Sequence, residues 1–141
     1  MTRRENREAV FLLLYQSSFN DSPLEEIAEA MSEEFELDAK PAEAELLIKR
    51  AKAVMENADK ADEIIAKYST TRRVERIPKV SVAIMRVALY EMDLDEEVPD
   101  KVAMNEAIEL CKKYADSSDR GFVSGLLGSY YRATRTQNEH D

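Results

Sequence analysis

The sequence contains few of the residues that build disulfides, metal centres and hairpins. It has one cysteine and one histidine in 141 residues, which excludes an internal disulfide and a multi-cysteine metal site. Three glycines and four prolines leave little material for hairpin turns. We find no secretory signal and no apolar stretch near the ~18 residues of a membrane span. We therefore expect a globular protein of the reducing cytoplasm.

The motifs of common catalytic sites are also missing. We find no glycine-rich phosphate loop, no HExxH motif, no Ser–His–Asp set and no Cys–His pair. Cys111 lies in a helical-looking segment, where a buried thiol is the expected role, and His140 lies in a polar tail. Abundant carboxylates are typical of solvated helix faces. We expect no catalytic residue, no cofactor and no metal.

Hydrophobic residues recur at three- and four-residue steps along most of the chain, which predicts helices and no strand. We expect an all-α fold of about seven helices, with one domain over residues 1–132 and a flexible tail at 133–141. The expected helices begin near Arg3, cover 23–35, 41–55, a short segment ending near Tyr68, 79–92 and 100–114, and end with one from Ser118 or Asp119.

Three glycines, Gly121, Gly125 and Gly128, fall within the last predicted helix. Each lowers helix propensity by about 1 kcal/mol relative to alanine, so each requires a structural reason. We expect that reason to be the close approach of a neighbouring helix.

Charge is unevenly distributed along this acidic chain. The formal net charge is -9. Residues 21–38 hold eight acidic residues and no basic one, and 93–100 hold five more acids and no base. By contrast, "TRRVERIPK" at 71–79 holds four basic residues against one acid, and "MTRRENR" opens the chain with three arginines. The basic zones, rather than the net charge, bear on whether the protein binds a polyanion.

The arginines show a repeated spacing. Arg3 and Arg7 lie four residues apart on one helical face with Arg4 beside them, and Arg72 and Arg76 share the same spacing. Guanidinium groups so spaced can hold consecutive phosphates.

Aromatic residues accompany these arginines. Tyr15, Tyr68 and Phe122 lie near them in sequence or at comparable helix ends, which suits stacking on unpaired bases. The charge pattern alone equally allows solvated arginines that pair with the many acids.

Several ordered motifs give the chain a family resemblance. They are "RVALYE" at 86–91, "VPDKVAMNEAIEL" at 98–110, "FVSGLL" at 122–127, "RRENREAVFLLLYQ" at 3–16 and "RIPKVSVAIMR" at 76–86. With these motifs in this order, the chain resembles the NusB family of bacterial transcription antitermination factors. The resemblance covers nearly the whole chain and is weakest over 18–60.

This resemblance implies a fold of two packed helical bundles and a non-catalytic function. It implies binding of boxA-like RNA from ribosomal RNA leaders together with NusE, a small-subunit ribosomal protein. It further implies that the complex joins the elongating RNA polymerase with other Nus factors and suppresses termination.

The resemblance also assigns site residues by position. The implied RNA-binding residues are Arg3, Arg4, Arg7, Tyr15, Tyr68, Arg72, Arg76, Arg120 and Phe122. The implied NusE-facing residues are Glu75, Ser81, Arg86 and Glu91. We interpret Asn105, in the motif that matches most closely, as an inward-pointing side chain that ties the loop after Met92.

The chain departs from the family pattern near the last helix. Gly121 stands where a basic residue is usual, Ser124 where asparagine is usual, and Ser118 where an acid is common. The first change removes a phosphate contact and the last removes a repulsion, so the net effect on RNA affinity is open. We expect the helix N-terminus around 118–122 to present free N–H groups to an anion.

Two other functions fit the sequence. A protein-only adaptor could hold a basic partner with the acidic segments 21–38 or 93–100. A NusB-like accessory to a ribosomal RNA methyltransferase would need a separate catalytic polypeptide, because no methyl-donor-binding Rossmann segment is found here. The sequence leaves open the oligomeric state, the preferred RNA sequence and whether RNA binds without NusE.

Overall fold

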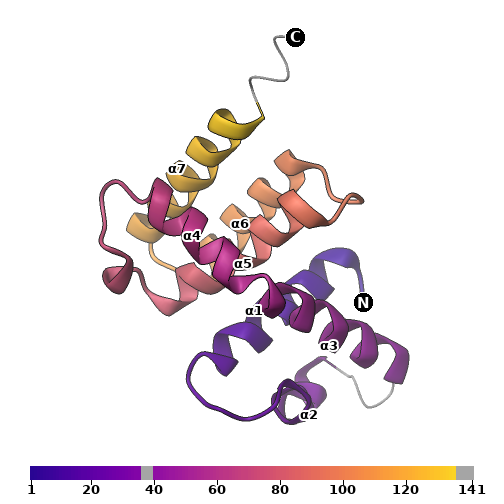
Figure 1. Cartoon of the computed structure of the whole chain (residues 1–141). Coiled ribbons are helices and arrows are strands. Elements are labelled where there is room, and N and C mark those ends of the chain that lie inside the picture. The colour runs from indigo at the N-terminus through magenta and orange to yellow at the C-terminus, as the bar shows by residue number, and fades with distance from the viewer. Residues whose placement is uncertain (36–39, 136–141) are drawn as a thin grey trace. The chain divides into compact units, whose positions relative to one another are not determined.

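A computed structural model describes residues 1–35 and 40–135, and within these ranges the chain is helical without strands (Figure 1). The expectation of an all-α fold with about seven helices is confirmed. The helices are α1 (Arg3–Ser17), α2 (Leu24–Phe35), α3 (Pro41–Glu56), α4 (Ala58–Tyr68), α5 (Lys79–Leu94), α6 (Asp100–Tyr114) and α7 (Ser117–Thr134), with a short 3-10 turn, η2 (Val74–Arg76), between α4 and α5.

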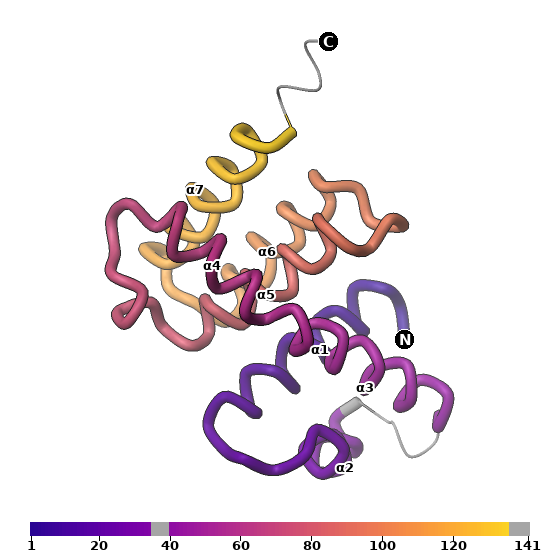
Figure 2. The backbone as a smooth tube through the Cα atoms, viewed as in Figure 1, coloured from indigo at the N-terminus to yellow at the C-terminus, as the bar shows by residue number. Residues whose placement is uncertain are grey.

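The chain forms two compact units, Met1–Asn57 with α1 to α3 and Ala58–Asp141 with α4 to α7. The tube view follows the chain through each unit in turn (Figure 2). Two groups of helices agree with the two bundles that the family resemblance implies.

The first unit is built around α1. A reciprocal capping box starts this helix, because the Glu5 backbone N–H donates to Thr2 Oγ1 at 3.1 Å and the Thr2 backbone N–H donates to Glu5 Oε1 at 3.2 Å. Helix α1 packs against both α2 and α3. Arg50 of α3 donates to the buried Asn6 Oδ1 at 2.6 Å, so a polar contact links the two helices.

Helix α5 forms the centre of the second unit. It contacts α4, α6 and α7, and it is buried on most of its circumference rather than along one stripe. Its buried residues are Ser81, Ala83, Ile84, Met85, Val87, Ala88, Leu89, Glu91 and Met92. The remaining helices of the unit pack on α5, and α7 packs on α4 and α6 as well.

The end of α7 is held by Arg135. Its guanidinium donates to Asp93 Oδ1 at 2.6 Å, to Asp100 Oδ2 at 3.1 Å and to the Met92 carbonyl at 3.1 Å, and it lies 5.1 Å from the centre of the Tyr130 ring. The helix continues to Thr134, so it extends into the segment that the sequence assigned to a tail. Residues 136–141 of that segment lie outside the described residues.

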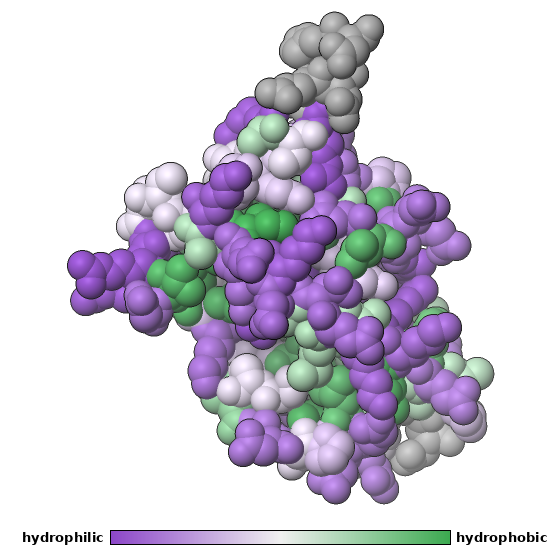
Figure 3. Space-filling model, in the orientation of Figure 1, coloured by the Kyte–Doolittle hydropathy of each residue, from purple (hydrophilic) through white to green (hydrophobic). Residues whose placement is uncertain are grey.

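Hydrophilic side chains dominate the face shown in the space-filling view, with hydrophobic areas between them (Figure 3). In the described ranges, no helix combines the length and the hydropathy that a membrane span requires.

We predict that Arg135→Ala lowers the stability of the protein by about 1–2 kcal/mol, because Asp93 and Asp100 lose a partly buried partner. Thermal unfolding followed by circular dichroism measures the change. The exposed Arg76→Ala serves as control and should leave the midpoint nearly unchanged. Equal midpoints for the two variants would contradict a role of Arg135 in holding α7.

A second prediction concerns Cys111, which is fully buried in α6 and whose pKa is raised by burial to about 11. In the unfolded chain the thiol ionises near 9.0, so its contribution to stability is complete below that pH and is lost as pH rises towards 11.

At pH 8 a thiol reagent should modify the native protein far more slowly than the protein in denaturant. Equal rates would show that the thiol is accessible.

Candidate nucleic-acid interface

The arginines at the start of α1 differ in how far they reach solvent. Arg3 and Arg7 lie on one face, with Arg4 next to Arg3. Arg4 is exposed and Arg3 is half-buried, whereas Arg7 is only 7% exposed. Arg3 and Arg4 are therefore the residues of this set whose guanidinium groups are better placed to meet a phosphate.

An aromatic cluster lies at the other end of α1, about 18 Å from Arg3 by helical rise. The Tyr15 ring stacks on Phe11 with centroids 5.9 Å apart, and Phe19 meets Tyr15 edge-on at 5.1 Å. Phe19 is 60% exposed. Neither the sequence nor the resemblance assigned Phe19 to the RNA surface. Its spacing of four residues from Tyr15 could have indicated that the two rings lie on one face.

Arg72 organises the second unit's part of the interface. Its guanidinium forms an ion pair with Asp119, donates to Ser118 Oγ at 2.8 Å and lies 4.7 Å from the centre of the Phe122 ring. The Arg72 carbonyl accepts a hydrogen bond from Ser69 Oγ at 2.5 Å. These contacts, which we call the Arg72 cluster, hold the loop after α4 against the first turns of α7.

The other implied RNA-binding residues of this unit flank the Arg72 cluster along the chain. Tyr68 ends α4, and its ring meets Tyr130 edge-on at 5.5 Å. Arg76 in η2 and Arg120 in α7 are exposed. The exposed Arg73 also belongs to the basic segment 71–79 and adjoins Arg72, but the resemblance did not assign it to the site.

A pocket of about 210 Å³ lies between the end of α4 and α7. Its lining is aromatic, hydroxyl-bearing and small, and consists of Tyr68, Thr70, Thr71, Gly121, Phe122, Gly125, Leu126 and Ser129. A Cβ atom added at Gly121 or Gly125 would meet no atom within 4 Å apart from those of its chain neighbours and of the adjacent helix backbone. The expectation that these two glycines permit close helix approach is therefore wrong.

The expected anion site at the start of α7 is also not available as proposed. The helix begins at Ser117, earlier than expected, and is capped by Asp116. The Asp119 N–H donates to the Asp116 carboxylate at 2.8 Å, and the Arg120 N–H donates to the Asp116 carbonyl at 3.0 Å. The Asp116 carboxylate satisfies the Asp119 N–H and the Asp116 carbonyl satisfies the Arg120 N–H, so the prediction of free N–H donors over 118–122 is wrong for Asp119 and Arg120.

The implied NusE-facing residues have different environments. Ser81 is fully buried and Glu91 is 6% exposed, so neither side chain is offered to a partner in this structure. Arg86 donates to both carboxylate oxygens of Asp62 at 2.9 and 2.6 Å, and this pairing raises the pKa of Arg86. Glu75 is exposed in η2. Glu75 and Arg86 thus remain the candidates that an incoming protein could contact.

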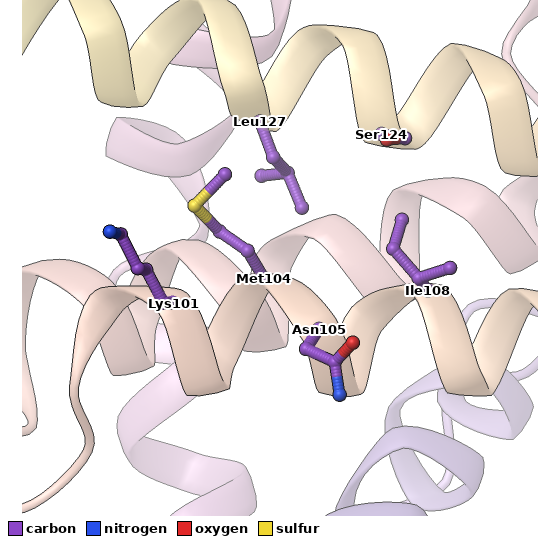
Figure 4. A pocket seen from close by; sticks show the side chains of 6 residues that line it. All are labelled: Lys101, Met104, Asn105, Ile108, Ser124 and Leu127. Carbon is purple, nitrogen blue, oxygen red and sulfur yellow. The ribbon is translucent and has the colours of Figure 1, made fainter.

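A second pocket, of about 230 Å³, lies between α6 and α7 (Figure 4). Asn105 contributes to its lining, but its side chain is exposed and points away from α7. The interpretation of Asn105 as an inward residue that ties the loop after Met92 is therefore wrong. Ser124, one of the departures from the family pattern, is exposed on the opposite wall.

The site offers cations and aromatic faces rather than reactive groups. Among residues 1–35 and 40–135, no group of three or more His, Cys, Asp or Glu side chains is arranged to hold a metal ion. The fixed Arg72 guanidinium beside the half-buried Phe122 ring, with exposed arginines nearby in sequence, suits contact with phosphates and stacking on unpaired bases.

Comparisons with known proteins show which family the chain belongs to. The chain is 34% identical over 140 residues to the transcription antitermination protein NusB of Clostridium botulinum, and the match covers 91% of this chain and 98% of that protein. The structure of T. maritima NusB superposes with a TM-score of 0.78 at 30% identity, covering 92% of this chain and 89% of the other.

A further match is a chain from a crystal structure of the antitermination factors NusB and NusE in complex with dsRNA. Its TM-score is 0.78 at 25% identity, and the match covers 94% of this chain and 99% of that one. The NusB family model itself matches residues 4–132. On this agreement of sequence, fold and family model, the chain belongs to the NusB family.

Proposed function

We propose that this protein is a non-catalytic antitermination factor that binds boxA-type single-stranded RNA of ribosomal RNA leaders. In this function it acts together with NusE and joins the elongating RNA polymerase with other Nus factors in the cytoplasm. The observation that carries the proposal is the Arg72 cluster, in which one guanidinium is fixed against an aromatic ring beside an open pocket.

Local positive charge makes RNA binding compatible with an acidic protein. The formal net charge of -9 repels a polyanion at long range, but interactions beyond about 8–10 Å are largely screened at physiological salt. Close contacts therefore depend on the groups nearest the strand. Arg4, Arg76 and Arg120 are exposed in the basic parts of the two units and can neutralise phosphates there.

Aromatic side chains supply the second component of single-strand binding. Tyr15, Tyr68 and Phe122 are half-buried, so each ring is supported by the protein and still reaches solvent. Base stacking on such rings tolerates different bases, because every base has a π-face. Exposed arginines and supported rings together favour an unpaired RNA strand over a duplex, whose bases are already stacked.

NusE is the proposed protein partner. The family member crystallised with NusE and dsRNA supports this choice, because its fold matches that of this chain over nearly its whole length. A ribosomal protein is basic, and the exposed Glu96 and Glu97 in the acidic segment 93–100 suit such a partner electrostatically. Glu75 and Arg86 are the residues of the implied NusE-facing set that we carry into the proposal.

We expect Arg4→Glu and Arg76→Glu each to weaken binding to boxA-like RNA. Removal of one phosphate contact should reduce the magnitude of the log–log salt slope by about 0.7. We chose these residues because they are exposed, whereas Arg7 is buried and Arg72 holds Asp119. Titration of labelled RNA at several salt concentrations measures both affinity and slope.

Charge-matched controls are available in each unit. Lys49→Glu in α3 and Lys101→Glu in α6 change exposed lysines outside the implied RNA surface, so they should reduce the slope much less. A wild-type slope near zero would refute direct contact with the RNA backbone. Equal losses of affinity in the variants and the controls would show that binding depends on overall charge rather than on a defined surface.

Replacement of Glu75 should affect the binding of NusE and the binding of RNA differently. Glu75 lies between Arg73 and Arg76, so Glu75→Gln should weaken capture of NusE without weakening RNA binding, because it removes a charge that repels phosphate. Capture of purified NusE after nuclease treatment, compared with the exposed control Glu63→Gln, measures the first effect. A loss of RNA affinity, or unchanged capture of NusE, would contradict this assignment.

A further inference from the structure

The pocket between the end of α4 and α7 contains two glycines that helix packing does not explain. Glycine within a helix is disfavoured relative to alanine. Gly121 and Gly125 lie inside α7, yet an added Cβ atom at either position would meet no atom within 4 Å. The space beside them is part of the pocket that Tyr68 and Phe122 also line.

The two rings of this pocket are each supported by a neighbouring side chain. The Arg72 guanidinium lies 4.7 Å from the centre of the Phe122 ring, and Tyr130 meets the Tyr68 ring at 5.5 Å. Because Arg72 is itself bound to Asp119 and Ser118, the Phe122 wall is fixed before a ligand arrives. A ring that is already held in place loses less conformational entropy on binding than a mobile ring does.

The rest of the pocket lining combines one apolar residue with three hydroxyl-bearing ones. Leu126 is buried, whereas Thr70 and Thr71 are exposed and Ser129 is half-buried. Hydroxyl groups both donate and accept hydrogen bonds, so they suit the mixed polar edge of a nucleobase. Clefts for drug-sized ligands measure roughly 300–1,000 Å³, so a pocket of about 210 Å³ suits one smaller ring system.

We propose that this pocket receives a single unpaired nucleobase of the bound RNA, and that Gly121 and Gly125 keep the pocket open for it. The inference rests on the proposed function, because the base enters as part of an RNA strand whose phosphates the arginines hold. It adds that one position of the RNA is bound through an inserted base, in the space that the two glycines leave open.

The test uses Gly125→Leu, which fills the pocket. The structure leaves room for the first side-chain atom, and leucine favours the helix more than glycine does, so the thermal midpoint should be maintained or raised. Ser124→Leu is the matched control, because the neighbouring Ser124 is exposed on the same helix but lines the other pocket. Gly125→Ala adds a single methyl group to the same space.

The RNA probe is a boxA-like oligonucleotide in which an abasic residue replaces each nucleotide in turn. For wild-type protein, one abasic position should weaken binding by roughly 5- to 150-fold, the effect of losing one stacked base. Gly125→Leu should show a loss in that range with intact RNA and little further loss at that abasic position. Ser124→Leu should behave as wild type throughout.

The outcomes separate this inference from the proposed function. If wild-type protein shows no salt-dependent RNA binding, both fail. If wild-type protein binds RNA but Gly125→Leu keeps full affinity, the base pocket alone is refuted. The base pocket is also refuted if the Leu variant loses affinity yet retains the full wild-type effect at every abasic position, because the substitution then acts elsewhere.

Discussion

The second unit's part of the interface depends on one ion pair, between Arg72 and Asp119. This pair joins a loop to a helix 47 residues further along the chain, and it places the guanidinium against Phe122. Both charges are mostly withdrawn from solvent, so the loss of either partner would leave the other poorly compensated. This contact helps to hold the loop after α4 and to support the Phe122 ring, which lines the adjoining pocket.

The sequence predicted the helices well because their ends carry local signals. Pro41 begins α3, and Pro78 and Pro99 immediately precede α5 and α6, so chain geometry marks these boundaries without tertiary information. The site was less predictable. The pairing of Arg72 with Asp119 is a long-range contact that no residue spacing encodes, and the burial of Ser81 follows from α5 lying at the centre of its unit.

The acidic and basic zones have different structural uses. In the segment 93–100, Asp93 and Asp100 bind Arg135 and so help to fix the end of α7. Arg135 is held strongly enough that, although burial opposes its charge, bonds to Asp93, Tyr130 and Asp100 raise its pKa. A charge count alone treats these acids as repulsive surface, whereas Asp93 and Asp100 hold Arg135 at the end of α7.

The concealment of Cys111 has a practical consequence for spectroscopy. Because the chain's single cysteine is fully buried, a cysteine introduced on the surface would be the only readily labelled thiol of the native protein. The exposed Thr70 lies at the rim of the pocket beside α7. A fluorophore attached there would report occupancy of that pocket directly, with the wild-type interior left intact.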